Sequence, residues 1–175
     1  MTGGQKGEYC ALFYNNKQLK MKNTDLFRLS KTSEIPSKIW DAASPRICIY
    51  LYFSLKEIQF WIFNTHFDHL GKMARFASSE LIFTKIAKIN KQEHPVILMG
   101  DFNALEREPL IQLITKKNLD SRYSSDHFFG GNSTFNGFNI VPEENRRIDF
   151  IFHNEHLIST KTAIISQLIE QHYPS

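Results

Sequence analysis

The chain has 175 residues, 42% of them hydrophobic and 22% charged, with a formal net charge of +3 at pH 7. This length allows one globular domain with a sizeable core, and the mild basicity is compatible with a phosphate-bearing ligand. The sequence excludes a membrane span because no run of 18 apolar residues occurs, and it contains no signal peptide, so a cytoplasmic location is expected by default if Met1 is the true N-terminus.

Strand-forming residues open the chain. Residues 8–15 and 18–22 predict a hairpin around a turn at 15–17, and residues 23–44 predict a polar loop. A second hairpin is predicted from 47–55 and 58–64, with aromatic residues on both faces, as in a sheet packed on two sides. Cys10 and Cys48 lie among these strand formers, so we expect small buried hydrophobes and no disulfide framework.

The hydrophobic period then becomes helical. Between residues 71 and 92 the apolar positions follow a stripe typical of a helix lying on a sheet: Ala74, Ala77, Leu81, Ile82, Ile86 and Ile89. A buried strand is predicted at 96–101, a short helix at about 108–117, a loop at 121–139, and strands at 146–153 and 161–170. Because no repeat or linker interrupts this order, a single domain over residues 1–175 is expected.

Polar side chains follow three of the predicted strands. His66 ends the second hairpin, Asp101 and Asn103 follow the buried strand, and Asp149 lies in the next one. If these strands are neighbours, one rim holds a histidine, two carboxylates and a carboxamide. Phosphate-ester hydrolysis needs such groups, because charge must be neutralised and a water aimed in line. The alternative for Asp101 and Asn103 is an Asx turn that caps its own backbone.

The run from His66 to His69 also suggests a zinc site. His-x-Asp-His is part of the metallo-β-lactamase pattern, in which a further histidine stands two residues earlier. This chain has Asn64 at that position, and no other histidine is suitably spaced. A zinc hydrolase of that type is therefore kept as the weaker alternative.

Taken in order, the segments 64–69, 100–104 and 147–152 resemble the endonuclease/exonuclease/phosphatase superfamily, which includes deoxyribonuclease I. The resemblance covers nearly the whole chain. It implies an α+β fold of two stacked, mostly antiparallel β-sheets flanked by helices, a four-layer sandwich that is incomplete here.

The same resemblance implies roles for four residues. Asp101 would orient and deprotonate the attacking water, Asn103 would hold the phosphate, His66 would donate to a phosphoryl oxygen, and Asp149 would pair with the family's catalytic histidine. A divalent cation, Mg²⁺ or Mn²⁺, would neutralise the phosphate charge. Further candidates for substrate contact are Arg46, Asp68, His69 and Arg75.

Two blocks of the family pattern have no counterpart in the chain: the principal metal-binding glutamate and the Ser-Asp-His block with the catalytic histidine. Ser125-Asp126-His127 has the right letters but precedes Asp149, so we interpret it as a coincidence. The metal ligands are therefore unknown, and the chain is expected to be a partial domain truncated at both ends.

Two functional hypotheses follow from these observations. The first is a metal-dependent phosphoesterase that hydrolyses phosphodiesters or phosphomonoesters. The second is a catalytically incompetent fragment of such a domain. Nucleic acid, a phospholipid head group and a sugar phosphate all fit the same rim as substrates, so the sequence leaves the substrate open.

Overall fold

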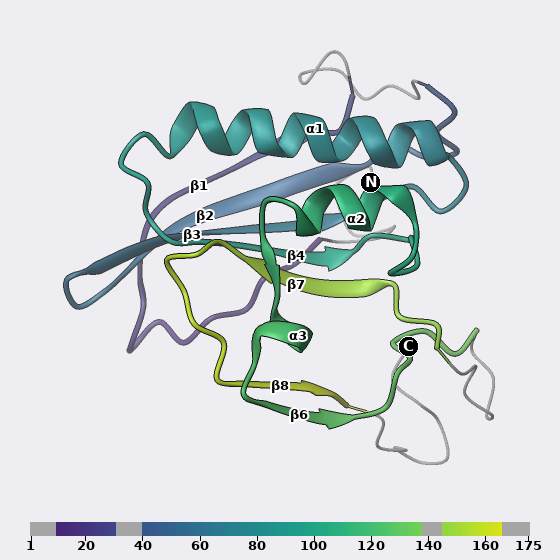
Figure 1. Cartoon of the computed structure of the whole chain (residues 1–175). Helices are drawn as coiled ribbons and strands as arrows, with labels where there is room; N and C mark the ends of the chain where they lie inside the picture. Colours follow the sequence, from purple (N-terminus) through teal and green to yellow (C-terminus); the bar gives the residue numbers. More distant parts are fainter. Residues whose placement is uncertain (1–9, 31–39, 138–144, 166–175) are drawn as a thin grey trace.

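A six-stranded sheet forms the centre of the computed structural model, which describes residues 10–30, 40–137 and 145–165 (Figure 1). Its strand order is β1-β2-β3-β4-β7-β5, and every pairing is antiparallel except that of β3 with β4. These strands are β1 (Lys20–Arg28), β2 (Ile47–Leu55), β3 (Ile58–His66), β4 (Val96–Asp101), β5 (Leu119–Asp120) and β7 (Asp149–His153). A second sheet pairs β6 (His127–Gly130) with β8 (Lys161–Ile164) in parallel.

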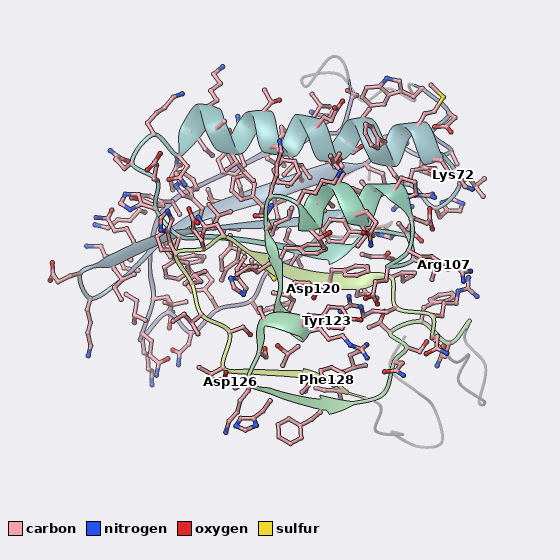
Figure 2. The ribbon with its side chains drawn as sticks, in the orientation of Figure 1. Lys72, Arg107, Asp120, Tyr123, Asp126 and Phe128 are labelled. Carbon is pink, nitrogen blue, oxygen red and sulfur yellow. The ribbon has the colours of Figure 1, made fainter. Side chains whose placement is uncertain are left out.

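Helices α1 (Lys72–Ile89) and α2 (Pro109–Thr115) lie on one side of the large sheet, and β6 and β8 lie on the other (Figure 1). The short helix α3 (Ser121–Ser124) lies between the two sheets; Tyr123 belongs to it and Asp120 directly precedes it (Figure 2). Helix α1 is the crossover that joins the parallel strands β3 and β4, because parallel neighbours cannot be joined by a tight turn. The expected α+β fold with two sheets and flanking helices is confirmed.

The core lies between the large sheet and the two longer helices. Phe63, Leu98 and Phe152 point from the sheet toward the helices, and Ile82 and Ile111 meet them; each is at most 1% exposed. Full burial of one such side chain stabilises the fold by about 1.5–3 kcal/mol. The core therefore holds β3, β4 and β7 side by side, and with them the rim at which the candidate residues stand.

The start of α1 depends on a residue far away in sequence. Asp41 accepts hydrogen bonds from the backbone N–H groups of Met73 and Ala74, at 3.1 and 2.8 Å, and so caps the first turn. Gly71 permits this approach, because a Cβ there would lie 2.6 Å from an Asp41 carboxylate oxygen. The predicted helix at 71–92 is thus confirmed, with its first turn set by a tertiary contact.

The beginning of the chain differs from the prediction. Residues 10–15 pair with no strand, whereas β1 runs through residues 23–28, which were expected to form a loop. The predicted turn at 15–17 does form, since Leu19 N donates to Asn15 O at 2.9 Å. The hairpin prediction is wrong because pairing with β2, from Lys20 opposite Ser54 to Arg28 opposite Ile47, outweighs the polar composition of β1. Residues 8 and 9 lie outside the described part.

The later strands also differ in extent. The expected loop at 121–139 contains α3 and β6, and β7 begins at Asp149 and not at residue 146. The last strand ends at Ile164, and residues 166–170 of the predicted strand lie outside the described part. Strands β2, β3 and β4 and helix α2 are confirmed within one or two residues. Cys48 is buried and Cys10 is half-buried, and neither forms a disulfide.

No helix in the described ranges is long and apolar enough to cross a membrane. That residues 1–175 form one incomplete domain stays a prediction.

Candidate active site

Three of the predicted residues form one row at the end of the large sheet. His66 is the register partner of Asp101 across β3 and β4, and Asp101 is the partner of Asp149 across β4 and β7. Register partners point to the same face of a sheet, so all three side chains lie on the face opposite α1 and α2. His66 Nε2 lies 3.4 Å from Asp101 Oδ2. The expectation that these strand ends share a rim is confirmed.

In the turn after β4, Asp101 and Asn103 form an Asx turn and also stand at the rim that holds the candidate residues. Asp101 Oδ1 accepts the backbone N–H of Asn103 at 2.7 Å, which is an Asx turn, and Asn103 has a φ of +48°. The Asn103 side chain donates to the Phe67 carbonyl at 3.0 Å, and Phe67 N donates to the Asp101 carbonyl at 2.8 Å. The turn therefore ties the ends of β3 and β4 together and fixes the Asp101 carboxylate beside His66.

Asp149 is held from the opposite side of the row. Its backbone N–H and that of Ile148 donate to the Thr134 hydroxyl oxygen at 3.1 and 3.0 Å. Although solvent reaches the side chain, desolvation by the protein around it raises the Asp149 pKa above its ordinary value, and a side-chain hydrogen bond with Thr134 opposes that rise. Thr134 is not among the residues predicted from the sequence, because nothing local distinguishes it within its polar loop.

Asp68 is a buried organiser of the loop that follows β3. It is 2% exposed, and its carboxylate accepts the backbone N–H groups of Ser44, Leu70 and Gly71 at 2.9, 3.0 and 2.7 Å. Burial alone would raise the pKa of Asp68, but these backbone donors outweigh it and lower the pKa to about 2. Both carboxylate oxygens are thus engaged by the protein itself.

Arg75 joins the two loops that carry the candidate residues. It is 4% exposed, and it donates to the Asp68 carbonyl at 3.1 Å and to Glu108 Oε2 at 3.2 Å. Glu108 Oε1 in turn accepts the Leu105 backbone N–H at 2.9 Å. Arg75 therefore links the segment after β3 to the segment that follows Asn103.

Arg46 and His69 lie next to each other at the same end of the molecule. Arg46 is 5% exposed, and its Nη2 lies 3.4 Å from His69 Nδ1. His69 itself is exposed. Of the four further candidates, Asp68 and Arg75 thus carry structural contacts, and His69 presents a surface to solvent.

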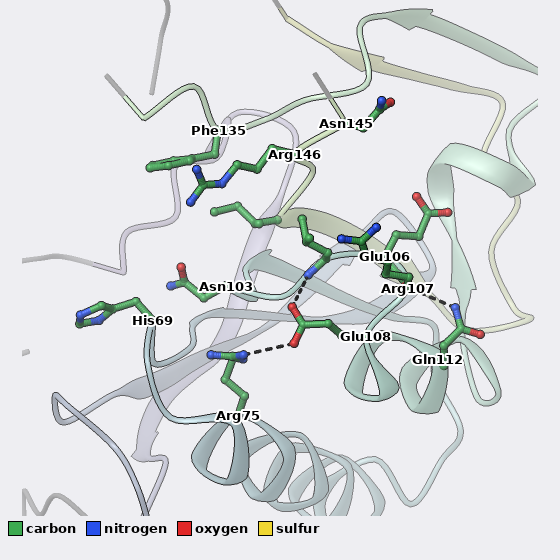
Figure 3. Close-up of a pocket in the computed structure, with 12 residues that line it drawn as sticks. His69, Arg75, Asn103, Glu106, Arg107, Glu108, Gln112, Phe135, Asn145 and Arg146 are labelled. Atoms are coloured by element: carbon green, nitrogen blue, oxygen red, sulfur yellow. Dashed lines mark hydrogen bonds and ion pairs between the residues drawn. The ribbon is translucent and has the colours of Figure 1, made fainter. Parts of the chain in front are cut away.

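A cavity of about 1110 Å³ opens next to Asn103 (Figure 3). Of the predicted residues, Asn103, His69 and Arg75 line it, whereas His66, Asp101 and Asp149 do not. Its other lining residues are Leu105, Glu106, Arg107, Glu108, Gln112, Phe135, Asn145, Arg146 and Ile148. A smaller cavity of about 560 Å³ lies between the two sheets, and Asp149 lines it.

The most deeply buried ion pair next to the site was not foreseen. Arg147 is 5% exposed and donates from both terminal nitrogens to the Asp120 carboxylate, with the Glu106 carboxylate 3.7 Å away. Its guanidinium carbon also lies 4.2 Å from the centre of the Phe150 ring. This pair anchors α3 to the strand that carries Asp149. The Arg-Arg-Ile-Asp run hinted at Arg147, but no local signal marks Asp120.

The described residues contain no group of three or more His, Cys, Asp or Glu side chains placed to hold a metal ion. His66 contacts Asp101, His69 contacts Arg46, and the Asp68 carboxylate accepts backbone donors. The zinc-hydrolase alternative therefore gains no support. Asp126, from the Ser-Asp-His string, lies beside the small sheet, away from the row (Figure 2).

Comparison with known proteins points to one family. The profile described as Endonuclease/Exonuclease/phosphatase family matches residues 31–167. No protein with curated function matches the chain in sequence.

Three solved bacterial structures are similar in sequence and fold. An endonuclease/exonuclease/phosphatase family protein from Bacteroides thetaiotaomicron is 33% identical with a TM-score of 0.80, over 85% of this chain and 56% of its own. A mannosyl-6-phosphatase of the same species is also 33% identical, with a TM-score of 0.79 over 85% and 57%. A family protein from Bacteroides vulgatus is 29% identical, with a TM-score of 0.84 over 91% and 65%. The chain thus spans between 56% and 65% of their lengths.

Proposed function

Because the chain belongs to the endonuclease/exonuclease/phosphatase family, we propose that it is a phosphoesterase whose reaction centre is the row His66, Asp101 and Asp149. The observation that carries this proposal is the register of three strands, which brings residues from distant parts of the chain to one rim. Hydrolysis of a phosphate ester needs a base for the attacking water and donors for the phosphoryl oxygens. The row offers both kinds of group within one line of side chains.

Asp101 is the proposed base. One of its oxygens accepts the Asn103 N–H and the other lies 3.4 Å from His66, so the carboxylate has one orientation. A positioned base typically contributes a factor of about 10²–10⁴ in rate. His66 is the proposed donor to a phosphoryl oxygen, and its contact with Asp101 fixes the distance between the two roles.

Asn103 and Asp149 complete the proposed set. Asn103 lines the large cavity and its backbone N–H donates to Asp101, and we assign it the role of contacting the phosphate. Asp149 has the proposed role of orienting a catalytic histidine. Within the described ranges its side chain has a hydrogen bond with Thr134 and none with a histidine, so the partner in this role is not identified in the chain.

A divalent cation is part of the proposal. Mg²⁺ commonly takes one or two carboxylates and completes its shell with water and phosphate oxygens. Asp101 and Asp149 already have other proposed roles, so the residues that would hold the ion at the row are not assigned among the described residues. Bound there, the cation would offset the negative charge of the phosphate.

The favoured substrate is a sugar monophosphate. A hollow of about 1110 Å³ is of the size that accepts a small molecule, and a relative with 33% identity is a mannosyl-6-phosphatase. Nucleic acid and phospholipid head groups are the other classes that the sequence left open.

Hydrolysis of p-nitrophenyl phosphate and bis(p-nitrophenyl) phosphate by the purified chain tests the proposal. We expect turnover with Mg²⁺ or Mn²⁺ that chelation abolishes, and a loss of roughly 100-fold or more in Asp101→Asn. Asp126→Asn is the matched control, because Asp126 is exposed and remote from the row. A folded chain whose rate equals that of Asp101→Asn would instead support the hypothesis of a catalytically incompetent fragment.

A further inference from the structure

The layer that covers the large sheet opposite the helices is open between two segments of the chain. Residues 10–15 lie across that face of the sheet, where the Asn64 side chain donates to the Ala11 carbonyl at 3.0 Å. Strands β6 and β8 form the other part of the layer (Figure 1). The cavity of about 560 Å³ is lined by Ala11 from the first part and by residues 162–165 from the second, so it lies between them.

The floor of this cavity is the register row next to the reaction row. Asn64, Met99 and Ile151 are partners across β3, β4 and β7, and each is two residues from a member of the reaction row. Residues two apart on a strand point to the same face, so the floor and the reaction row share one face of the sheet. All three line the cavity, and so does Asp149. A ligand that fills the cavity therefore lies over Met99 and Ile151 and reaches the row at Asp149.

One border of the cavity is the edge of a strand. Four consecutive residues line it from Thr162 to Ile165, in β8 and directly after it. Successive side chains of a strand point to opposite faces, so a cavity that touches consecutive residues lies against the edge of the strand. In the described part of the chain, β8 pairs with β6 alone. A pair of strands by itself is marginally stable, and a free edge offers backbone N–H and C=O groups to a further strand.

Exposed apolar side chains surround the opening of the cavity. Phe13 is 94% exposed, and Phe129 of β6, Ile151 of the floor and Ile165 are exposed as well. Apolar side chains gathered at one exposed surface mark a site of protein interaction. The apolar floor and the free edge together indicate a partner that has both apolar side chains and unpaired backbone groups.

Arg122 gives the opening a positive charge. Its side chain lines the cavity, its guanidinium carbon lies 4.4 Å from the centre of the Phe128 ring, and it donates to the neutral Asn132 amide. No carboxylate in the described ranges forms an ion pair with it. By contrast, the neighbouring Arg147 is neutralised by Asp120. A partner with a carboxylate at this end of the cavity would complement Arg122.

We propose that the cavity between the two sheets binds a β-strand of a partner polypeptide. The strand pairs with the edge of β8, places alternate apolar side chains on Met99 and Ile151, and presents a carboxylate to Arg122. A strand fits where a small molecule does not, because only a strand satisfies the backbone edge along the whole apolar floor. Such binding is a second activity besides the proposed hydrolysis and does not depend on it.

Calorimetric titration of the full chain with synthetic peptides tests the proposal. The probe is a nine-residue peptide of alternating valine and threonine with glutamate at both ends. Its matched control has proline at two central positions, where the peptide then lacks backbone N–H donors. We expect the probe to bind, and the proline peptide to bind at least about tenfold more weakly. A probe with glutamine in place of both glutamates should bind about threefold more weakly.

Variants of the chain locate the contact. Ile151→Lys places a charge on the floor and should weaken binding of the probe by about tenfold or more. Ile158→Lys is the matched control, because Ile158 is exposed and does not line the cavity, and it should change the affinity by less than about twofold. Arg122→Gln should remove the advantage of the glutamate peptide over the glutamine peptide. Circular dichroism establishes folding, and Ile151→Thr replaces Ile151→Lys if the latter does not fold.

Four outcomes overturn the proposal. The probe could fail to bind, or it could bind the Ile151→Lys chain equally well, which would place it elsewhere on the surface. The proline peptide could bind as tightly as the probe, which would exclude strand pairing. Sedimentation could show a dimer that Ile151→Lys abolishes, which would assign the surface to a second copy of the chain. The proposed function is judged separately, by turnover of p-nitrophenyl phosphate that depends on Asp101.

Discussion

Replacing Gly100 with alanine tests how the reaction row is built. Gly100 precedes Asp101 in β4 and has a φ of +133°, a conformation that side-chain-bearing residues rarely adopt. A Cβ there would lie 1.9 Å from the Thr65 carbonyl oxygen on the neighbouring strand. That atom belongs to the backbone of β3, so it cannot move without disturbing the pairing that places His66 beside Asp101.

The expected cost follows from two contributions. An unfavourable backbone conformation costs about 1–3 kcal/mol, and overpacking against a fixed neighbour adds about 1–3 kcal/mol. Gly100→Ala should therefore lower the free energy of unfolding by roughly 2–6 kcal/mol, a large share of the 5–15 kcal/mol typical of whole domains. The proposed hydrolysis of phosphate esters should slow as well, because the displacement reaches Asp101, which follows Gly100 and is the register partner of His66.

Urea unfolding followed by fluorescence of the buried Trp61 measures this change. Gly131→Ala is the matched control, since nothing lies within 4 Å of a Cβ built there and its φ is outside the left-handed range. That variant should stay within about 0.5 kcal/mol of the original chain. Equal unfolding midpoints for the two alanine variants would refute the close approach of β3 and β4 at Gly100.

Acid, a buried charge and the pH profile provide three more predictions. The pKa of Asp68 in the folded chain is about 2, below its value in the unfolded chain, so ionised Asp68 stabilises the fold by roughly 2 kcal/mol. This stabilisation is complete above the unfolded pKa and is lost as the pH falls toward 2. Urea titrations of Asp68→Asn should therefore lack this acid-dependent loss of stability. Asp120→Asn should lower the free energy of unfolding by about 3–5 kcal/mol, because Arg147 loses its buried counter-ion, whereas Glu106→Gln, at an exposed partner, should cost less than about 1 kcal/mol by the same assay. Because the pKa of Asp149 is raised, the rate should begin to fall at a pH above the ordinary aspartate range as the solution is made more acidic. Thr134→Val removes the hydrogen bond that lowers this pKa, so the fall in rate should move to higher pH in that variant. A fall in rate that stays at the same pH or moves to lower pH would contradict the role of this hydrogen bond.

Strands and helices with a strong local pattern were predictable from the sequence. Strand β4 is a run of apolar residues, and α1 has helical spacing with helix-forming residues, so neighbours along the chain already specify both. The prediction that His66, Asp101 and Asp149 lie together likewise needed only the assumption that the ends of three strands meet. Residues 23–28 of β1 and all of β6 were missed because their sequences are polar or short, and pairing with β2 and β8 stabilises them.

The roles of individual side chains depended on contacts between residues distant in sequence. The sequence marked Asp68 and Arg75 as candidates for substrate contact, yet Asp68 accepts a backbone N–H from Ser44 and Arg75 donates to Glu108, 24 and 33 residues away. Arg147 finds its buried partner 27 residues away at Asp120. A charged residue tolerates burial only where folding brings opposite charges or backbone donors to it, and no local pattern records that.

The sequence by itself thus determined the family, the main strands and the residues that could form a reaction row. The tertiary structure alone decided that the row is continuous across β3, β4 and β7, and that the cavity between the two sheets opens over the next register row on the same face. The physical reason is that periodicity and turn chemistry act between neighbours along the chain, whereas register, burial and charge pairing depend on atoms that only folding brings together.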